Sequence, residues 1–258
     1  MRPDTTVFTV EYDANGVTLM TRQGISELLD SFKEKTSSLS GTYGFYVIEV
    51  DNKSEVRSYG LDQDVTFKAA SLIKLPTLAA LYMEAEKGTV GLDETYTLLN
   101  SDKRTGAGSL YSKAEGTSLT YRELAGLMGK ESDNTAFAII RKKLGDSRIN
   151  QAIEEIGMKS TSLKENKTSA HDIALFFQKL WKGDLVSEAS RDEILEYLTD
   201  TAYEDWIVKG IPKEVRVAHK YGRELHVVND AGIVFAEKPF VIVIITQGII
   251  EKEADAII

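Results

Sequence analysis

Stretches typical of β-strands occur at both ends of the chain, separated by a long middle part. Near the amino end, residues 44–50 and 54–60 are rich in β-branched and aromatic residues and flank Asp51-Asn52-Lys53, a predicted hairpin turn. Three more such runs lie near the carboxyl end, at 215–219, 226–236 and 240–247. Strands distributed in this way pair most simply in one antiparallel sheet. The first and last parts of the chain must therefore meet.

The middle of the chain has the apolar spacing of helices. Thr120-Tyr121-Arg122-Glu123 is a capping box, Gly145 and Gly157 stand where glycine ends a helix, and Ser169 stands where a serine begins one. Helices are expected at 25–35, covering one face of the sheet, and at 71–87, 120–128, 133–144, 147–156, 170–181 and 187–198.

These elements together predict a mixed α/β fold (α+β, in two lobes). Its first lobe is a five-stranded antiparallel sheet with flanking helices, formed by residues 1–65 and 213–258. An all-helical lobe, residues 66–212, is inserted between these two segments. Both lobes together are expected to make one domain, because the chain of 258 residues, 42% of them hydrophobic, can bury a large core.

Charge and cysteine content exclude several classes of function. The formal net charge of −9 repels phosphate backbones and anionic lipids, so we expect no nucleic-acid partner. The absence of cysteine excludes disulfides, cysteine-based metal sites and a thiol nucleophile. The longest strongly apolar run, residues 240–245, is far too short to span a bilayer, and the amino end has no apolar signal core.

Ser71 and Lys74 are the strongest candidates for chemistry. A serine at the start of a helix and a lysine three residues later lie on one face, within reach of each other. The positive end of the helix dipole favours an oxyanion there, and a buried lysine has the lowered pKa that a base requires. Alone, the spacing is also that of an N-cap serine beside a solvated lysine.

Two further motifs follow in the chain, and the histidines offer a weaker alternative. Ser132-Asp133-Asn134 opens the helix expected at 133–144, and Lys220-Tyr221-Gly222 is expected to end a strand, where its glycine lets the backbone approach a ligand. The simpler explanation of Ser132 and Asp133 is helix capping, and that of Lys220 is a charge on an edge strand. The three histidines, His171, His219 and His226, show no metal-ligand spacing. Capping or edge positions explain His171 and His226, and His219 stands beside Lys220 on a strand, so neither a histidine base nor a metal site is expected.

The three motifs in this order resemble the class A β-lactamase and penicillin-binding-protein superfamily, with its Ser-x-x-Lys, Ser-Asp-Asn and Lys-Thr-Gly set. The resemblance extends from about Gly41 to Gly248 and includes Leu110-Tyr111-Ser112 and 119–124. It implies a serine nucleophile that needs no metal and no cofactor.

The resemblance also assigns roles to residues of this chain. Ser71 is implied to be the acylated nucleophile, Lys74 its proton acceptor and Ser132 a relay to the leaving nitrogen. Lys220 is implied to stabilise charge near Ser132 and the substrate carboxylate. The implied substrate contacts are Asn134, Tyr111, Tyr221, Gly222 and Arg223, of which Arg223 is also expected to supply an oxyanion-hole N–H together with Ser71.

This chain departs from the family pattern in two places. The loop that carries a deacylating glutamate in class A β-lactamases is shortened here, and Glu165 is left either as a remnant base or, as we favour, as a solvated carboxylate. Tyr221 stands where the family has threonine or serine, so it either contacts the substrate with its phenol or packs on the sheet. Arg223 is the substitute candidate for the carboxylate contact.

From these observations we expect a serine hydrolase that forms an acyl-Ser71 intermediate with β-lactams or D-Ala-D-Ala-type peptides and deacylates slowly, as a penicillin-binding protein does. A positioned general base typically speeds a reaction by roughly 10²- to 10⁴-fold. Losing the loop and its glutamate should therefore slow hydrolysis of the acyl-enzyme by about this factor. The alternatives are a true β-lactamase that hydrolyses without the usual glutamate, and a non-catalytic sensor on the same fold. The resemblance also implies a monomer located outside the cytoplasm and acting on a small-molecule or peptidoglycan-peptide substrate.

Overall fold

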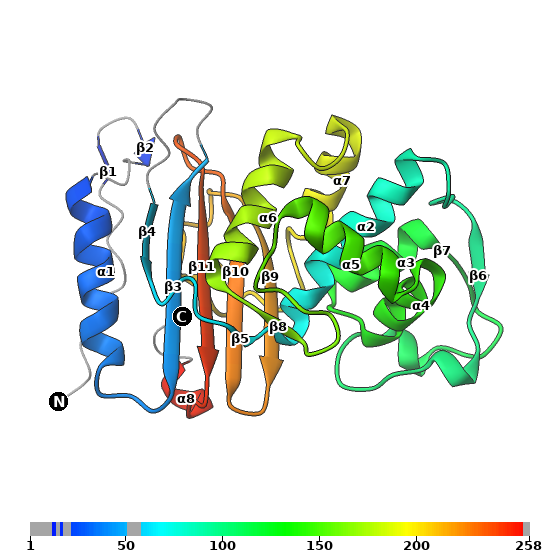
Figure 1. The fold of residues 1–258 in the computed structure, drawn as a ribbon, viewed down its shortest axis with the longest axis horizontal. Helices are drawn as coiled ribbons and strands as arrows, with labels where there is room; N and C mark the ends of the chain where they lie inside the picture. The colour runs from blue at the N-terminus through cyan, green and yellow to red at the C-terminus, as the bar shows by residue number, and fades with distance from the viewer. Residues whose placement is uncertain (1–11, 14–15, 18–21, 51–57, 255–258) are drawn as a thin grey trace.

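The computed structural model describes residues 12–13, 16–17, 22–50 and 58–254. Its centre is one antiparallel sheet in the order β4-β3-β11-β10-β9 (Figure 1). The strands are β3 Thr42–Glu49, β4 Ser58–Leu61, β9 Val217–Glu224, β10 Val227–Val234 and β11 Phe240–Gln247. Phe45 of β3 pairs with Ile244 of β11, so the two ends of the chain meet as predicted. The five-stranded antiparallel sheet is confirmed.

Strand β9 differs from the expected strand in length. The sequence predicts that Lys220-Tyr221-Gly222 ends the strand, whereas β9 continues to Glu224 and pairs with Val227 of β10. The reason is the tight connection, in which His226 takes a positive φ of 60° and turns the chain directly into β10. The third motif therefore lies inside an edge strand. The hairpin turn expected at 51–53 falls outside the described residues.

The two faces of the sheet bury different elements because side chains alternate along a strand. On one face, Phe32 of α1 (Arg22–Thr36) stacks on Phe45 with ring centroids 4.9 Å apart. On the other face, α6 (Ala170–Lys182) packs against β3, β10 and β11, which carry Tyr46, Ile48 and Val243 into the larger core cluster. Helix α1 therefore covers one face of the sheet, as predicted.

Most remaining helices lie beyond the β9 edge of the sheet (Figure 1). Helix α2, Lys74–Glu86, runs through their centre, and all nine residues from Lys74 to Tyr82 are buried. A helix buried on every side is expected where others surround it. Its neighbours are α3 Tyr121–Lys130, α4 Asn134–Leu144 and α5 Asp146–Ile156, and α7 Glu188–Tyr197 packs on α3.

Short elements complete the chain. The 3₁₀ turns are η1 Ala70–Ile73, η2 Asn100–Asp102, η3 Leu110–Ser112 and η4 Val208–Gly210. The short strands pair as β1 Tyr12–Asp13 with β2 Gly16–Val17, β5 Phe67–Lys68 with β8 Lys167–Thr168, and β6 Thr95–Thr97 with β7 Ser118–Thr120. The last helix is α8, Glu251–Ala254. The single helix expected at 71–87 is thus a 3₁₀ turn followed by α2.

Several predicted helix ends are confirmed by their caps. Thr120 and Glu123 form the reciprocal capping box of α3. The hydroxyl of Ser169 accepts a hydrogen bond from Asp172 N at the start of α6. Gly157 ends α5 in the left-handed conformation, with φ 89°. The lobe boundaries at 66 and 212 stay a prediction.

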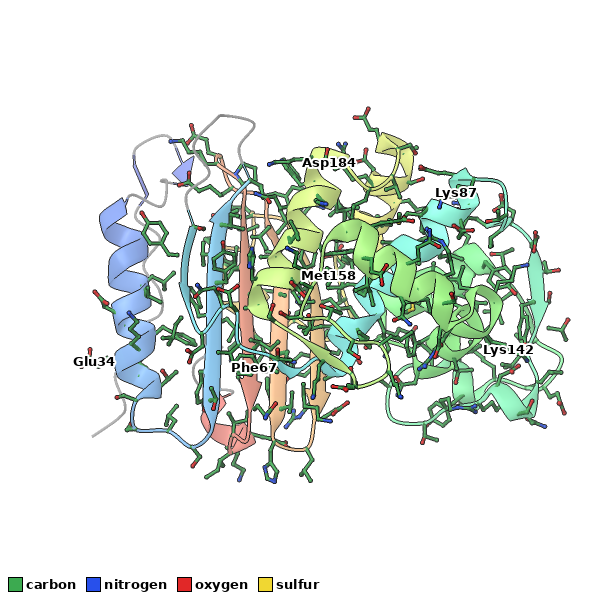
Figure 2. All side chains as sticks on the ribbon, in the orientation of Figure 1. Glu34, Phe67, Lys87, Lys142, Met158 and Asp184 are labelled. Atoms are coloured by element: carbon green, nitrogen blue, oxygen red, sulfur yellow. The ribbon has the colours of Figure 1, made fainter. Side chains whose placement is uncertain are left out.

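Phe67, labelled in Figure 2, joins the sheet to the segment that leads to Ser71. Its ring is 1% exposed and lies so close to Gly44 of β3 that a Cβ there would meet the ring at 2.9 Å. Gly44 therefore permits the close approach of β5 to β3. The nucleophile candidate is in this way anchored directly on the sheet.

Candidate active site

The backbone before Ser71 is held by a side chain of β10 and by the main chain of the loop at Asn166. Asn229 of β10 donates from Nδ2 to Lys68 O at 2.9 Å and to Ala69 O at 3.2 Å, and Ala69 N donates to Asn166 O at 2.9 Å. Ala70 takes a φ of +46°, in the left-handed region that costs a non-glycine residue of order 1–3 kcal/mol. Such strain persists only where the surroundings over-determine the backbone.

Lys74 lies at the centre of the candidate site. Its Nζ is 3.0 Å from Ser71 Oγ, 3.1 Å from Ser132 Oγ, 2.5 Å from Ser132 O and 2.7 Å from Asn134 Oδ1. A neutral amine has two N–H donors and one lone pair. The two shortest contacts go to oxygens that only accept, so they take the two donors. The lone pair is then available to accept the proton of Ser71.

The surroundings of Lys74 favour this neutral form. Burial lowers the pKa of Lys74 from 10.5 to about 8, against the opposing effect of the Asp133 carboxylate. Lys220 is 1% exposed, and burial together with the nearby charge of Lys74 holds the pKa of Lys220 well below its usual range. Two buried lysines in one site disfavour double protonation. An appreciable fraction of Lys74 is therefore unprotonated near neutral pH.

The second motif is built around a strained turn. Ser132 has a φ of +54°, and Asp133 caps α4 by accepting from Ala136 N at 2.8 Å while its other oxygen accepts from Leu110 N at 2.8 Å. Asn134 begins α4 and donates from Nδ2 to Thr105 O at 2.9 Å. Asp133 is thus fully engaged in the scaffold, whereas Ser132 Oγ and Asn134 Oδ1 both face Lys74.

The third motif closes the site from the sheet side. A Cβ on Gly222 would lie 2.8 Å from Ser71 N and 3.1 Å from Ala70 Cβ, so only glycine lets β9 approach the nucleophile this closely. Lys220 lies on the same face of β9 as Gly222, since side chains alternate. The structure therefore brings together Ser71, Lys74, Ser132, Asn134, Lys220 and Gly222, all of them predicted from the sequence.

Three other predicted residues are placed differently. The ring of Tyr111, on η3, is 43% exposed. Tyr221 has its ring against Tyr203 and Trp206, with centroids 5.4 and 6.4 Å away, and it supports the Lys220 ammonium at 4.2 Å. The Arg223 guanidinium forms an ion pair of 2.7 Å with Glu251 of α8. Their predicted contacts with the substrate stay predictions.

The arrangement matches a known family. The model of the beta-lactamase enzyme family matches residues 23–258. The chain belongs to that family. A beta-lactamase of Proteus vulgaris is 25% identical over 238 residues, covering 83% of this chain and 78% of that protein. The predicted superfamily is thereby confirmed.

Solved structures of the family have the same fold. The structure of PBP-A superposes with a TM-score of 0.82 at 28% identity, covering 90% of this chain and 92% of that one. A beta-lactamase from Sphaerobacter thermophilus gives a TM-score of 0.83 at 26% identity with the same coverage of both chains. A PBP-A variant has also been solved as an acyl-enzyme complex with penicillin G, with a TM-score of 0.80.

Glu165 lies outside the cluster around Ser71. Its carboxylate is exposed and forms an ion pair of 2.8 Å with Lys167, which holds the pKa of Glu165 below its usual range. The neighbouring Asn166 differs. It has a φ of +50°, its Nδ2 donates to Glu224 at 2.9 Å, and its buried Oδ1 has no hydrogen-bond partner among the described residues. The short loop thus contacts the segment before Ser71 through the main-chain carbonyl of Asn166, which accepts from Ala69 N, and not through a carboxylate.

Sequence reasoning missed two residues of β10, Asn229 and Asp230. Both are fully buried. Asn229 contacts the segment before Ser71, and Asp230 contacts His219. The signal was present in the chain, because two adjacent polar residues interrupt an otherwise apolar strand, 227–234. Buried polar groups require partners, so such an interruption marks a built contact. It does not reveal which partner is used.

Over the described ranges, no group of three or more histidine, aspartate or glutamate side chains is placed to hold a metal ion. In the same part of the chain, no helix is both long enough and apolar enough to cross a membrane.

Proposed function

We propose that this family member forms an acyl-enzyme at Ser71 with β-lactams and with D-Ala-D-Ala-type peptides, and releases the acyl group slowly. The observation that carries the proposal is the contact between Lys74 Nζ and Ser71 Oγ, 3.0 Å, in a site where the pKa of Lys74 is about 8. A nucleophile beside a base of matched pKa is the arrangement that acyl transfer needs.

Acylation begins with a proton transfer from Ser71 Oγ to Lys74 Nζ. The oxygen attacks the carbonyl carbon, a C–O bond forms, and the carbonyl electron pair moves to the oxygen. The N–H groups of Ser71 and Arg223 stabilise that oxyanion. The glycine contact supports this assignment for Ser71, since Gly222 lies directly against Ser71 N.

The intermediate collapses when the carbonyl re-forms and the C–N bond breaks. The leaving nitrogen takes the proton of Ser132 Oγ, and Lys74 replaces that proton across the 3.1 Å contact. Lys220, buried on the face of β9 that carries Gly222, binds the substrate carboxylate, whose negative charge favours the protonated form of this amine. Asn134 binds the amide of the acyl side chain. Tyr111 forms one wall of the cleft.

Slow deacylation follows from the loop at 163–169. Glu165 is exposed and paired with Lys167, so it makes a weak and misplaced base. Hydrolysis without a positioned base loses roughly 10²- to 10⁴-fold. An acyl-enzyme that persists is the behaviour of a penicillin-binding protein, and the acyl-enzyme complex of a PBP-A variant with penicillin G is consistent with it. We also propose, from the family alone, that the protein acts outside the cytoplasm as a monomer.

A second candidate is a β-lactamase that turns over, and Asn166 is the observation that favours it. The buried Asn166 Oδ1, which has no partner in the described part of the chain, is a place for an ordered water. The main-chain oxygen of the same residue accepts from Ala69 N at 2.9 Å, two residues before the nucleophile. Water held at Oδ1 would be close to the acyl group. The family name and the relatives named beta-lactamase agree with this candidate.

Intact-mass spectrometry after mixing with penicillin G distinguishes these functions. A slow penicillin-binding protein gives a stoichiometric adduct that persists, and Ser71→Ala gives none. A β-lactamase consumes many equivalents of penicillin or nitrocefin and shows little adduct at steady state. A folded wild type that neither forms an adduct nor consumes the antibiotic contradicts acylation and favours a sensor.

A further inference from the structure

A buried histidine and aspartate lie directly behind the third motif and have no part in the acylation steps. His219 Nδ1 is 2.8 Å from Asp230 Oδ1, and the two residues are 1% and 0% exposed. His219 is the residue before Lys220 on β9, and its side chain lies on the face opposite that of Lys220. This face also carries the Tyr221 ring, 6.3 Å from the imidazole.

The contacts of His219 fit protons on both ring nitrogens. Thr201 Oγ1 is 2.9 Å from His219 Nε2 and lies 3.0 Å from Tyr203 O and 2.9 Å from Glu204 Oε1, two oxygens that only accept. When the hydroxyl proton of Thr201 goes to one of these oxygens, Thr201 accepts from Nε2, and Glu204 Oε1, 3.4 Å from Nε2, is a second acceptor. With Asp230 accepting from Nδ1, this arrangement is that of an imidazolium.

The charges around the imidazole agree with this protonation state. Burial acts to lower the pKa of His219, but Asp230 and then Glu204 outweigh it and raise this pKa to about 9. The other groups that face the ring are Thr201, the half-buried Tyr221 and, through the backbone of β9, Lys220. The two carboxylates therefore control the charge of His219.

This network fixes the position of the segment 201–207. Besides the two contacts to His219, Ile207 N donates to Asp230 Oδ2 at 3.1 Å. The segment carries Tyr203 and Trp206, whose rings lie 4.4 Å apart and both pack on Tyr221. One buried ion pair, His219 with Asp230, therefore binds both ends of segment 201–207 and fixes the position of this segment relative to β9.

Tyr221 in turn determines where the Lys220 ammonium lies. The Lys220 Nζ donates to Tyr221 O at 3.0 Å and lies 4.2 Å from the centroid of the Tyr221 ring. A cation over an aromatic face is stabilised without a carboxylate partner. The family threonine or serine lacks such a ring, so this chain requires something to hold the ring in place.

We propose that His219 is a positioning residue, which in its doubly protonated form holds segment 201–207 against β9 so that Tyr203 and Trp206 fix the Tyr221 ring beneath Lys220. This inference rests on the proposed function for its kinetic consequence, since Lys220 is where a substrate carboxylate is expected. Its structural content, the charge of His219 coupled to the aromatic cluster, does not depend on acylation.

The sharpest variant is Glu204→Gln, because it keeps the acceptor oxygen and removes only the charge. Thr201→Val removes the acceptor of Nε2 and leaves Asp230 in place. The matched control is His171→Gln, because His171 forms a His–Asp contact of the same length, 2.8 Å to Asp64, but on the surface. The readout is the ring ¹⁵N chemical shifts of the three histidines against pH, with Trp206 fluorescence recorded in a Trp181→Phe background.

We expect His219 to stay protonated through pH 8 in the wild type and to titrate at lower pH in Glu204→Gln. In both proteins the Trp206 fluorescence should change at the pH at which His219 titrates. The rate of penicillin acylation should fall at high pH with the midpoint of the His219 titration. In Glu204→Gln this falling limb of the pH profile should move to lower pH, while the rising limb keeps its midpoint. When His219 is neutral and Lys220 is displaced, the penicillin concentration that gives half of the maximal acylation rate should rise about tenfold. His171→Gln should match the wild type.

Two results overturn the proposal. One is a His219 that titrates near 6.5 in the wild type or does not respond to Glu204→Gln. The other is a falling limb that stays in place while the His219 titration moves, which assigns the limb to Lys220 alone. If no acylation occurs at all, the proposed function fails, but the ¹⁵N and fluorescence titrations still decide the role of His219. Thr201→Val repeats both readouts should Glu204→Gln not fold.

Discussion

The amine of Lys74 lies 3.0 Å from the hydroxyl oxygen of Ser71, and burial sets the pKa of this amine to about 8. Only the unprotonated amine can accept the serine proton. The rate constant of acylation should therefore rise about tenfold per pH unit below pH 8 and stop rising there, before the fall expected where His219 loses its proton near pH 9. Stopped-flow acylation by nitrocefin from pH 5.5 to 8.5 measures this limb.

The control for this profile is the double variant His171→Gln, His226→Gln, which leaves the buried His219 untouched. We expect its rising limb to coincide with that of the wild type. A limb centred near 6.5 that disappears in the double variant would identify a histidine, rather than Lys74, as the base.

Gly222 determines how closely β9 approaches the nucleophile. A Cβ at this position would lie 2.8 Å from Ser71 N, so Gly222→Ala must push the strand away or block the N–H. Loss of one oxyanion donor costs about 10²- to 10³-fold. We expect Gly222→Ala to reduce acylation by this factor while the rising pH limb keeps its midpoint. The control is Gly210→Ala, at a glycine without a positive φ where a Cβ meets no atom within 4 Å.

Much of this fold was predictable because the local signals and the long-range pairing agree. The apolar strands at both ends, the capping box at Thr120 and the glycine at 157 each match an observed element. The six clustered residues were predictable for two different reasons. Spacing along one helix face brings Ser71 and Lys74 together. Ser132, Asn134, Lys220 and Gly222 lie far away in the chain and were placed in the site by the resemblance of the three motifs to the family.

The remainder of the site depends on contacts that spacing does not encode. The direction of Tyr221 depends on Tyr203 and Trp206, which lie in an irregular segment without a period. The pairing of Arg223 with Glu251 depends on where the chain passes after β11. His219 is a strand residue like any other until Asp230 is known to lie beside it. Such residues are determined by tertiary packing, which the one-dimensional pattern does not contain.

The loop after α5 is expected to supply no catalytic carboxylate. Because Glu165 is exposed and paired with Lys167, Glu165→Gln should change the deacylation rate less than twofold. If water is instead held by Asn166 Oδ1, which has no partner among the residues that the structure describes, Asn166→Ala should slow deacylation about tenfold or more and leave acylation unchanged. The decay of the penicillin adduct, followed by intact mass, measures both. A large loss in Glu165→Gln would restore the glutamate mechanism.

Asn229 links β10 to the backbone before Ser71 through two hydrogen bonds, at 2.9 and 3.2 Å. Asn229→Leu leaves the carbonyls of Lys68 and Ala69 without this partner, at a cost of about 1–3 kcal/mol. We expect urea unfolding to report a loss of this size and acylation to fall more than stability alone explains. The comparison is Asn100→Leu, whose amide bonds an exposed glutamate, Glu115. Equal losses of stability in the two variants would contradict the assignment.

The buried His219 also makes stability depend on pH in a defined direction. Its pKa is raised from 6.5 in the unfolded chain to about 9 in the folded one, so the folded state binds more protons between these values. The stabilisation is complete below pH 6.5 and is lost as pH rises through 9. A shift of this size is worth about 3 kcal/mol at most. The difference in unfolding free energy between wild type and His219→Gln should therefore be largest at pH 6 and shrink towards pH 10, as measured by urea denaturation. A difference that is constant with pH, or that grows above pH 8, would mean that His219 is neutral in the folded protein.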